Sequence, residues 1–149
     1  MPTYAENRKA RHDFEILDIL EAGLVLAGHE VKSIRAGRVK LDGGYVLVRG
    51  GEAFLVGITI PPYQVANTPA SYDPERPRKL LLNKKELAKL ERETETARLT
   101  AVPIKLYNKN QKIKLTVAIA RGKKKYDKRE TIKARDTDRE LKRTLKQHT

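Results

Sequence analysis

The sequence predicts a small, mainly β domain, a barrel of about six strands with one or two short helices, followed by a basic C-terminal tail. Short apolar runs recur through the first 120 residues, with turn residues between them. Strong helix signals occur in one segment, near residues 83–94. Beyond residue 121 the apolar alternation stops, and lysine and arginine dominate. We therefore expect a barrel domain at residues 1–120 and a tail at residues 121–149.

The first strand signal lies in residues 13–28, which we expect to form a hairpin. Phe14 and Ile16 alternate with carboxylates, as in a half-buried strand. Glu-Ala-Gly at 21–23 then supplies a turn, and the apolar pattern resumes at 24–26.

A short helix and a second hairpin are expected next. In HEVKSIRAGR, residues 29–38, two apolar residues stand three positions apart and Gly37 ends the segment, while the other face is basic. Residues 45–48 and 53–60 are strand candidates, and the Arg-Gly-Gly-Glu between them suits a tight turn.

The middle of the chain combines a loop with the main helix. Residues 61–78 hold five of the seven prolines, which excludes regular helix and central strand and predicts a long loop. A short apolar strand at 78–82 follows. Asn83 and Glu86 then form a capping-box pattern, which predicts a helix to about residue 94 with a narrow apolar stripe.

Two further strands complete the barrel, at 99–107 and 112–121, joined by a turn at 108–111. In the last strand four apolar residues share one face: Ile113, Leu115, Val117 and Ile119. The other face carries Lys112, Lys114, Thr116 and Ala118. Short hairpin-linked strands of this kind close as a partly Greek-key barrel, and the OB-type barrel is the common nucleic-acid-binding member of this class.

The charge of the chain points to a polyanionic partner. Lysine and arginine number 32 against 19 aspartates and glutamates, a formal charge of +13. Residues 121–149 contain 12 cations and 5 carboxylates, so 12 − 5 = +7 of this charge lies in the tail. An amphipathic membrane helix needs bulky apolar anchors opposite its basic face, and the tail has few, so RNA is the favoured partner and no membrane is expected.

The tail can form a basic helix. At roughly 100° per residue five cations fall in one stripe, namely Lys128, Arg135, Arg139, Lys142 and Lys146. Ala134, Leu141 and Leu145 gather on another side. This apolar strip is thin, so we expect the tail to be disordered alone and helical when bound. Tyr126 can stack on a base; the alternative is a solvated charge run that maintains solubility.

Several classes of chemistry lack the residues they need. The chain has no cysteine and three scattered histidines, so we expect neither disulfides nor a metal site, and no cofactor. No nucleophile motif or phosphate-binding glycine loop accompanies the carboxylates, which argues against an enzyme. No apolar run reaches the roughly 20 residues of a membrane span, and the N-terminal segment has no signal-peptide core, so a cytoplasmic location is expected. We also expect the protein to be a monomer.

Two residues in basic surroundings have alternative interpretations. Glu30 either orients Lys32 and Arg35 through ion pairs, the favoured hypothesis, or accepts a hydrogen bond from a base edge. His12 either contacts a base or phosphate, or only caps a strand.

Five segments closely resemble the SsrA-binding protein family, also called small protein B. They are NRKARHDF (7–14), EAGLVLAGHEVKSIRAG (21–37), RPRKLLLNKKEL (76–87), VPIKLY (102–107) and RGKKKYDKRETIK (121–133). The resemblance implies a bacterial OB-type protein without catalytic activity that binds the tRNA-like domain of tmRNA and delivers it to stalled ribosomes for trans-translation. It implies that the barrel replaces a missing anticodon arm, and that the tail becomes helical in the empty mRNA channel against small-subunit ribosomal RNA.

The resemblance also implies site residues. It assigns tmRNA binding to Glu21, Leu81 and Lys114, with Leu81 expected to pack beneath the RNA face. Five neighbours are expected on that face: Asn7, Arg8, His12, Lys32 and Arg35. Decoding-centre contacts fall on Gly122, Lys123, Lys124, Tyr126, Asp127, Lys128 and Arg129. The tail helix adds Arg135, Arg139, Leu141 and Leu145.

Two positions depart from the family pattern. His29 stands where relatives often have Trp or Thr, and we expect a surface variation there. Thr137 stands where some relatives have a tryptophan, which leaves Leu141 and Leu145 as the apolar tail contacts.

Two other functions stay open at this point. A basic ribosomal protein or RNA chaperone would bind many RNAs with little selectivity and a steep salt dependence. An RNA-modifying or RNA-cleaving enzyme would need an active-site constellation.

Overall fold

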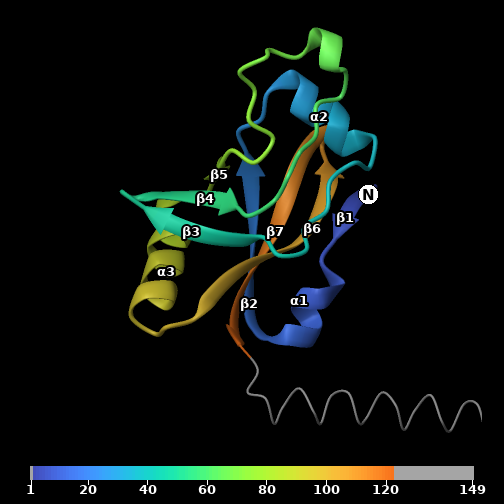
Figure 1. The fold of residues 1–149 in the computed structure, drawn as a ribbon. Helices are drawn as coiled ribbons and strands as arrows, with labels where there is room; N and C mark the ends of the chain where they lie inside the picture. The colour runs from blue at the N-terminus through green and yellow to red at the C-terminus, as the bar shows by residue number, and fades with distance from the viewer. Residues whose placement is uncertain (1, 123–149) are drawn as a thin grey trace, which may run out of the picture.

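Seven antiparallel strands, three α-helices and one short 3₁₀ helix make up the part of the protein, residues 2–122, that this computed structural model describes (Figure 1). In chain order they are β1 (Thr3–Glu6), α1 (Arg8–Asp13), β2 (Phe14–Leu24), α2 (Gly28–Arg35), β3 (Tyr45–Arg49), β4 (Glu52–Val56), η1 (Val65–Asn67), β5 (Arg78–Leu81), α3 (Lys84–Glu95), β6 (Thr100–Lys109) and β7 (Lys112–Gly122).

The sheet closes on itself. Its order is β1-β6-β3-β4-β5-β2-β7, and β6 also pairs with β7, so β2 to β7 form a closed ring. β1 pairs with residues 105–107 of β6, along the edge of β6 that β3 meets at Ala101. The seam between β3 and β6 is narrow, since its register contains the single pair Val46 and Ala101. The predicted mainly β fold is confirmed, with a third α-helix, α1, beyond the one or two expected.

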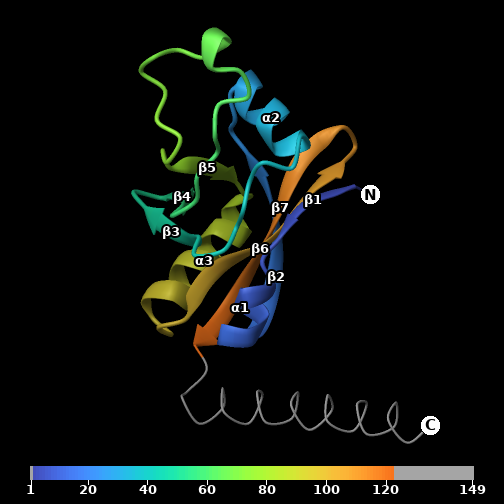
Figure 2. The same ribbon diagram turned by 45° about the vertical axis from the view of Figure 1, so that its right-hand side comes forward.

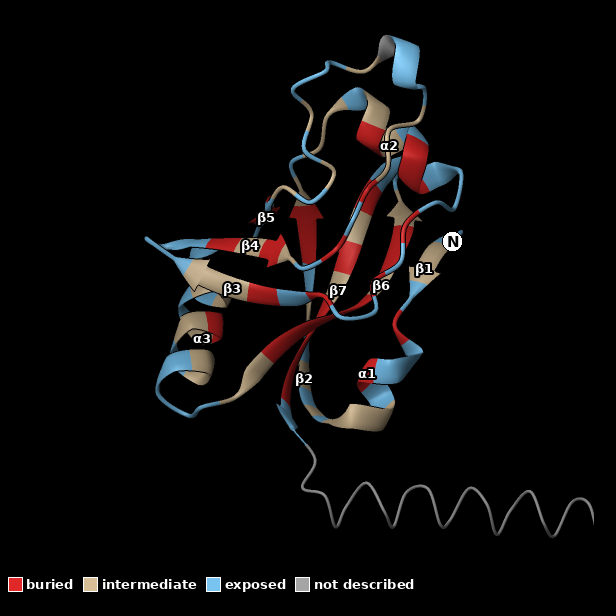
Figure 3. Ribbon diagram, viewed as in Figure 1, coloured by how far each residue is buried: buried red, intermediate tan, exposed pale blue. Residues whose placement is uncertain are grey.

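The barrel interior holds the main core. Ile113, Leu115, Val117 and Ile119 all point inward from β7, as their alternation predicts, and each is at least nine-tenths buried. Leu90 of α3 is fully buried in the same cluster. Figure 3 shows the buried residues concentrated along β4, β6 and β7. Each such aliphatic side chain contributes about 1.5 to 3 kcal/mol relative to exposure.

A second, smaller core lies outside the barrel, beneath α1. Ala10 of α1 packs on Ala118 and Ala120 of β7, with Val102 and Ile104 beside them. Ala118 lies on the face of β7 that the alternation predicts, but it is buried because α1 covers that part of the face. The small alanine side chains let the helix lie close to the sheet.

Two strand predictions need correction. Residues 14–24 form one strand rather than a hairpin, since β7 pairs with this segment from Phe14 to Gly23. The backbone of Gly23 is not left-handed, so it makes no turn. The strand expected at 53–60 ends at Val56, because Gly57 adopts a φ of +78° and breaks the extended backbone.

Local signals for caps and turns were predicted correctly. Asn83 accepts a hydrogen bond from the Glu86 N–H at 2.8 Å, and the Glu86 carboxylate accepts one from the Asn83 N–H at 3.2 Å. Asn110 and Gln111 have φ of 51° and 64°, so the β6–β7 hairpin closes through a two-residue left-handed turn.

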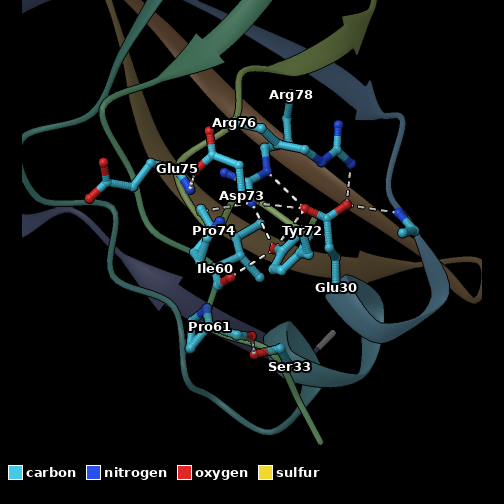
Figure 4. A network of polar contacts seen from close by, with 11 residues as sticks. Glu30, Ser33, Ile60, Pro61, Tyr72, Asp73, Pro74, Glu75, Arg76 and Arg78 are labelled. Carbon is cyan, nitrogen blue, oxygen red and sulfur yellow. Dashed lines mark hydrogen bonds and ion pairs between the residues drawn. The ribbon is translucent and has the colours of Figure 1, made fainter. Parts of the chain in front are cut away.

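A buried ion network fixes the proline-rich loop on α2 (Figure 4). Glu30 and Arg78 are both 0% exposed, and their side chains pair at 2.8 Å. Arg76 pairs with the other carboxylate oxygen of Glu30, and the Tyr72 hydroxyl lies 3.1 Å from Glu30. Burial alone would raise the pKa of Glu30, but the N–H of Ala27 and the two arginines more than offset this, and the pKa lies below its usual value.

The network corrects two predictions from the sequence. Glu30 pairs with Arg76 and Arg78 rather than with Lys32 and Arg35, because the buried face of α2 carries Glu30, Ser33 and Ile34 while Lys32 and Arg35 are exposed. His29 is half-buried, not a surface variation.

The ring of His29 stands edge-on against Tyr72, with ring centroids 4.4 Å apart. Ser33 holds the loop further along, where its hydroxyl donates to the Pro61 carbonyl at 2.7 Å. The loop between β4 and β5 is therefore tied to α2 near its start, at Pro61, and near its end, at Tyr72 and Arg76.

The two short helices flank β2 at opposite ends (Figures 1 and 2). α1 leads directly into Phe14, the first residue of β2, whereas α2 follows the last, Leu24. An 11-residue strand spans about 33 Å. Gly122 pairs with Phe14, so the segment beyond residue 122 begins at the α1 end.

Candidate RNA-binding surface

Three strands bring charged side chains together on the outer face of the barrel near α2. In the register, Glu21 of β2 lies opposite Thr116 of β7, and Lys114 lies opposite both Gly23 of β2 and Tyr107 of β6. Ile113 and Leu115 point inward, so Lys114 and Thr116 point outward. Glu21 and Lys114, 93 positions apart in the chain, therefore share one face.

Tyr107 organises this face. Its hydroxyl donates a hydrogen bond to Glu21, and its ring is 5% exposed. Lys109 lies 3.2 Å from both carboxylate oxygens of Glu21, and the Lys105 ammonium lies 5.3 Å from the Tyr107 ring centroid. Glu21 is thus held in one orientation among lysines.

The electrostatics keep the donor and acceptor in fixed protonation states. The hydrogen bond from Tyr107 lowers the pKa of Glu21 against the opposing effect of burial, and Lys109 and Lys114 lower it further. Burial, followed by the Glu21 carboxylate, raises the pKa of Tyr107 to about 12. At neutral pH Glu21 is therefore an anion and Tyr107 a neutral donor.

Leu81 joins this surface from β5, but as an exposed residue. It pairs with Gly23 and is 53% exposed, so the expectation that it packs beneath the RNA face is wrong. The reason lies in the alternation of β5, where Arg78 and Leu80 point inward and Lys79 and Leu81 outward.

Arg35 of α2 reaches the same region. Its guanidinium donates to the Gln111 carbonyl in the β6–β7 turn at 3.2 Å. Lys32 is exposed on the same helix. The structure therefore brings together five of the eight residues expected on the RNA face: Glu21, Lys32, Arg35, Leu81 and Lys114.

The other three lie at the α1 end, across the length of β2. Asn7 is 5% exposed, and its side chain caps α1 by accepting from the Ala10 N–H and donates to the Pro103 carbonyl. Asn7 therefore holds α1 on the barrel instead of facing a ligand. Arg8 is exposed beside Glu6, and His12 lies 2.9 Å from the Asp13 carboxylate within α1.

Sequence reasoning missed Tyr107, Lys105 and Lys109. These three residues alternate along β6, so a period-two pattern in VPIKLYNK carried the signal. The predicted tail contacts lie outside the described residues: Lys123, Lys124, Tyr126, Asp127, Lys128, Arg129, Arg135, Arg139, Leu141 and Leu145. Gly122 is the last residue of β7 and is exposed.

Residues 2–122 contain neither a cluster of metal-binding side chains nor a membrane-spanning helix. Within that range no three His, Cys, Asp or Glu side chains are grouped so that they could hold a metal ion. None of the helices in that range is long and apolar enough to cross a membrane.

Replacing Tyr107 by phenylalanine is expected to raise the pKa of Glu21 and to lower the free energy of unfolding by about 1 kcal/mol, because Glu21 loses its strongest donor. A carbon-detected NMR titration of the Glu21 carboxyl gives the pKa. A lowered folded-state pKa stabilises the fold above the ordinary value of 4.5, and this contribution is lost as the pH falls through the folded pKa. The variant should therefore lose less stability on acidification than the wild type.

Tyr45→Phe is the matched control. The Tyr45 side chain is 47% exposed and makes no hydrogen bond within the described range, so its loss should leave the Glu21 pKa unchanged. If the Glu21 carboxyl titrates identically in the wild type and in Tyr107→Phe, the Tyr107 hydroxyl does not lower the pKa of Glu21.

The chain is similar to one known protein family, to curated proteins and to solved structures. Residues 4–147 match the family model described as SmpB protein. The SsrA-binding protein of Enterococcus faecalis is 51% identical over 142 residues, covering 95% of this chain and 92% of that protein. The SsrA-binding protein of Streptococcus mutans is 50% identical over 143 residues, covering 96% and 92%. A solved structure described as "tmRNA-SmpB: a journey to the center of the bacterial ribosome" matches with a TM-score of 0.67 and 43% identity, covering 89% of this chain and 95% of that one.

Proposed function

The chain belongs to the SmpB family of SsrA-binding proteins, and from this premise we propose that it binds tmRNA and acts with it on the ribosome in trans-translation. The RNA feature recognised is the tRNA-like domain, which the protein delivers to stalled ribosomes. One observation in the structure carries the proposal furthest: Glu21, Leu81 and Lys114 converge on one exposed face from three strands.

The chemistry of this face suits a folded RNA. Lys32, Arg35 and Lys114 supply charges for backbone phosphates. Glu21, held by Tyr107, presents a fixed carboxylate that can accept hydrogen bonds from base N–H groups or a ribose 2′-hydroxyl. A fixed acceptor among cations selects RNA geometry, because an RNA without a donor at that position would cover the carboxylate and leave it without a hydrogen-bond partner.

The two ends of the barrel have separate roles in this proposal. Residues 1–120 form the RNA-binding barrel and residues 121–149 the ribosome-contacting tail, which begins beside α1 and away from the Glu21 surface. The tail carries +7 of the formal charge, and we assign to it the contacts with small-subunit ribosomal RNA in the decoding centre and empty mRNA channel. The protein acts as a cytoplasmic, monomeric adaptor without catalytic activity.

Binding selectivity tests this function. We expect the protein to bind the tRNA-like domain of tmRNA at least about 100-fold more tightly than an elongator tRNA of equal length at about 150 mM salt, where phosphate attraction alone is much reduced. That ratio corresponds to about 2.7 kcal/mol. Filter binding or fluorescence anisotropy with both RNAs measures it, and any RNA turnover in the same mixtures would support an enzyme instead.

Lys114→Ala gives an internal check on the same measurement. Removing one phosphate contact should reduce the slope of log affinity against log salt by about 0.7 to 0.9.

Equal affinity of the wild type for the two RNAs would favour the general RNA-chaperone hypothesis and contradict the proposal.

A further inference from the structure

A groove of about 290 Å³ lies beside the Glu21 surface, between α2, the end of β2 and the start of β7. Its lining is mainly apolar and includes Gly23, Leu26, Val31 and Leu81. Its rim carries three cations: Arg35, Lys112 and Lys114. This volume is at the lower end of the range for ligand pockets, which begins at about 300 Å³. The groove therefore has room for one small flat group and not for a larger ligand.

The apolar part of the groove is unusual on a surface this basic. Leu81 is 53% exposed, whereas its neighbour Leu80 points into the barrel and is 3% exposed. Exposed apolar area costs roughly 25 cal/mol per Å², so burial of Leu81 by a ligand would be favourable. A nucleotide matches both parts of the groove, since its base has an apolar face and its phosphates are anionic.

Gly23 sets the depth of the groove. Its backbone is not left-handed, so no turn requires a glycine there. A Cβ atom at this position would lie 3.3 Å from the Leu81 Cβ and 3.5 Å from the Lys114 ammonium nitrogen. The side chains of Leu81 and Lys114 therefore lie close to the Gly23 backbone, and a larger residue at this position would push them into the groove.

The walls of the groove are held in place before any ligand arrives. The Arg35 guanidinium is anchored to the β6–β7 turn through the Gln111 carbonyl at 3.2 Å. Glu30 of α2 and Arg78 of β5 pair at 2.8 Å in the interior, which ties together the two elements that carry Arg35 and Leu81. A preformed site loses less conformational entropy on binding.

We infer that this groove takes one unstacked base of the bound RNA, against Leu81 and the Gly23 backbone, with the flanking phosphates on Arg35, Lys112 and Lys114. The inference rests on the proposed function and specifies how the surface would recognise its RNA. Gly23 is then a specificity-determining residue, because its missing side chain admits the base.

Abasic substitution tests the groove directly. Each unpaired nucleotide of the tRNA-like domain is replaced in turn by an abasic residue, and affinities are measured with wild type and with Gly23→Leu. For wild type, one position should cost about 10-fold in affinity, in keeping with the loss of one base contact. With the groove filled in Gly23→Leu, the intact RNA should bind about 10-fold more weakly, and the abasic change at that same position should cost nothing further.

Two further variants serve as controls. Gly28→Leu makes the same substitution where an added Cβ meets nothing within 4 Å, and it should keep the wild-type abasic profile. Thermal unfolding checks that Gly23→Leu is folded. Leu81→Ala, at an exposed position, repeats the test by removing the apolar wall, and it too should abolish the abasic penalty at the one position.

The outcomes separate the two proposals. Equal abasic profiles for wild type, Gly23→Leu and Leu81→Ala, with preference for the tRNA-like domain intact, would overturn the groove inference alone. Failure of the wild type to prefer the tRNA-like domain over elongator tRNA would overturn the proposed function. An abasic penalty present in wild type and absent from both groove variants would support the groove as the base site.

Discussion

Replacing Glu30 by alanine is expected to lower the free energy of unfolding by about 3 to 5 kcal/mol, because it leaves buried arginine charge without a counter-ion. Arg78 is 0% exposed and relies on Glu30 for its ion pair, and the Tyr72 hydroxyl loses a partner in the same change. Urea unfolding followed by circular dichroism measures the effect. The variant should also release the proline-rich loop, which would become more sensitive to protease.

An exposed ion pair supplies the control for this experiment. Glu52 and Lys79 lie 3.0 Å apart, and both side chains are more than 40% exposed. Glu52→Ala should therefore cost less than about 1 kcal/mol. The double variant Glu30→Leu with Arg78→Met should recover much of the loss, since it removes both charges together. If Glu30→Ala is no more harmful than Glu52→Ala, the network does not hold α2.

Removing residues 123–149 is expected to abolish ribosome rescue and to leave selective tmRNA binding in place. β7 is complete at Gly122, which pairs with Phe14, so a cut after Gly122 removes no strand of the barrel. The Glu21 surface and the groove beside it lie near the other end of β2. A reconstituted translation system with a message lacking a stop codon measures rescue as addition of the tmRNA-encoded tag, which should fall to background.

A tail of identical composition in scrambled order is the matched control for charge. It retains the electrostatic contribution to RNA affinity, so any difference from the natural tail reports sequence-specific contacts. Tagging by the truncated protein at the wild-type rate would contradict the division between barrel and tail. Loss of selective tmRNA binding on truncation would also contradict this division, because the barrel alone would then not be the tmRNA-binding part.

Much of the fold could be predicted from local patterns. The capping box at Asn83 and the hairpin turn within residues 108–111 depend on residues within four positions of each other, and both were predicted from the sequence. The inward face of β7 followed from strict alternation. The same alternation did not predict that Ala118 is buried, because α1 covers its side of the strand, and short α1 has little periodicity of its own.

The wrong predictions at the candidate site share one cause, which is that partners distant in the sequence decide where each residue lies. The 21–23 segment has turn-forming composition, yet Gly23 lies in a strand because β5 and β7 pair with it on either side. Glu30 has cations two and five positions away in the sequence, but the helix turns it to the interior, toward partners 46 and 48 positions distant. Leu81 was assigned to packing because it is apolar, whereas the register of β5 turns it outward.

By itself the sequence determined the charge of the chain, its family motifs, most of its strands, the cap of its main helix, and the boundary near residue 121 at which the composition changes, because these depend on residue types and near-neighbour spacing. Only the tertiary structure decided which outward-facing residues meet. Tyr107 bonds to Glu21 across 86 positions, and Gly23 lies between Leu81 and Lys114, because sheet register is set by burial of the whole barrel core and not by any segment alone.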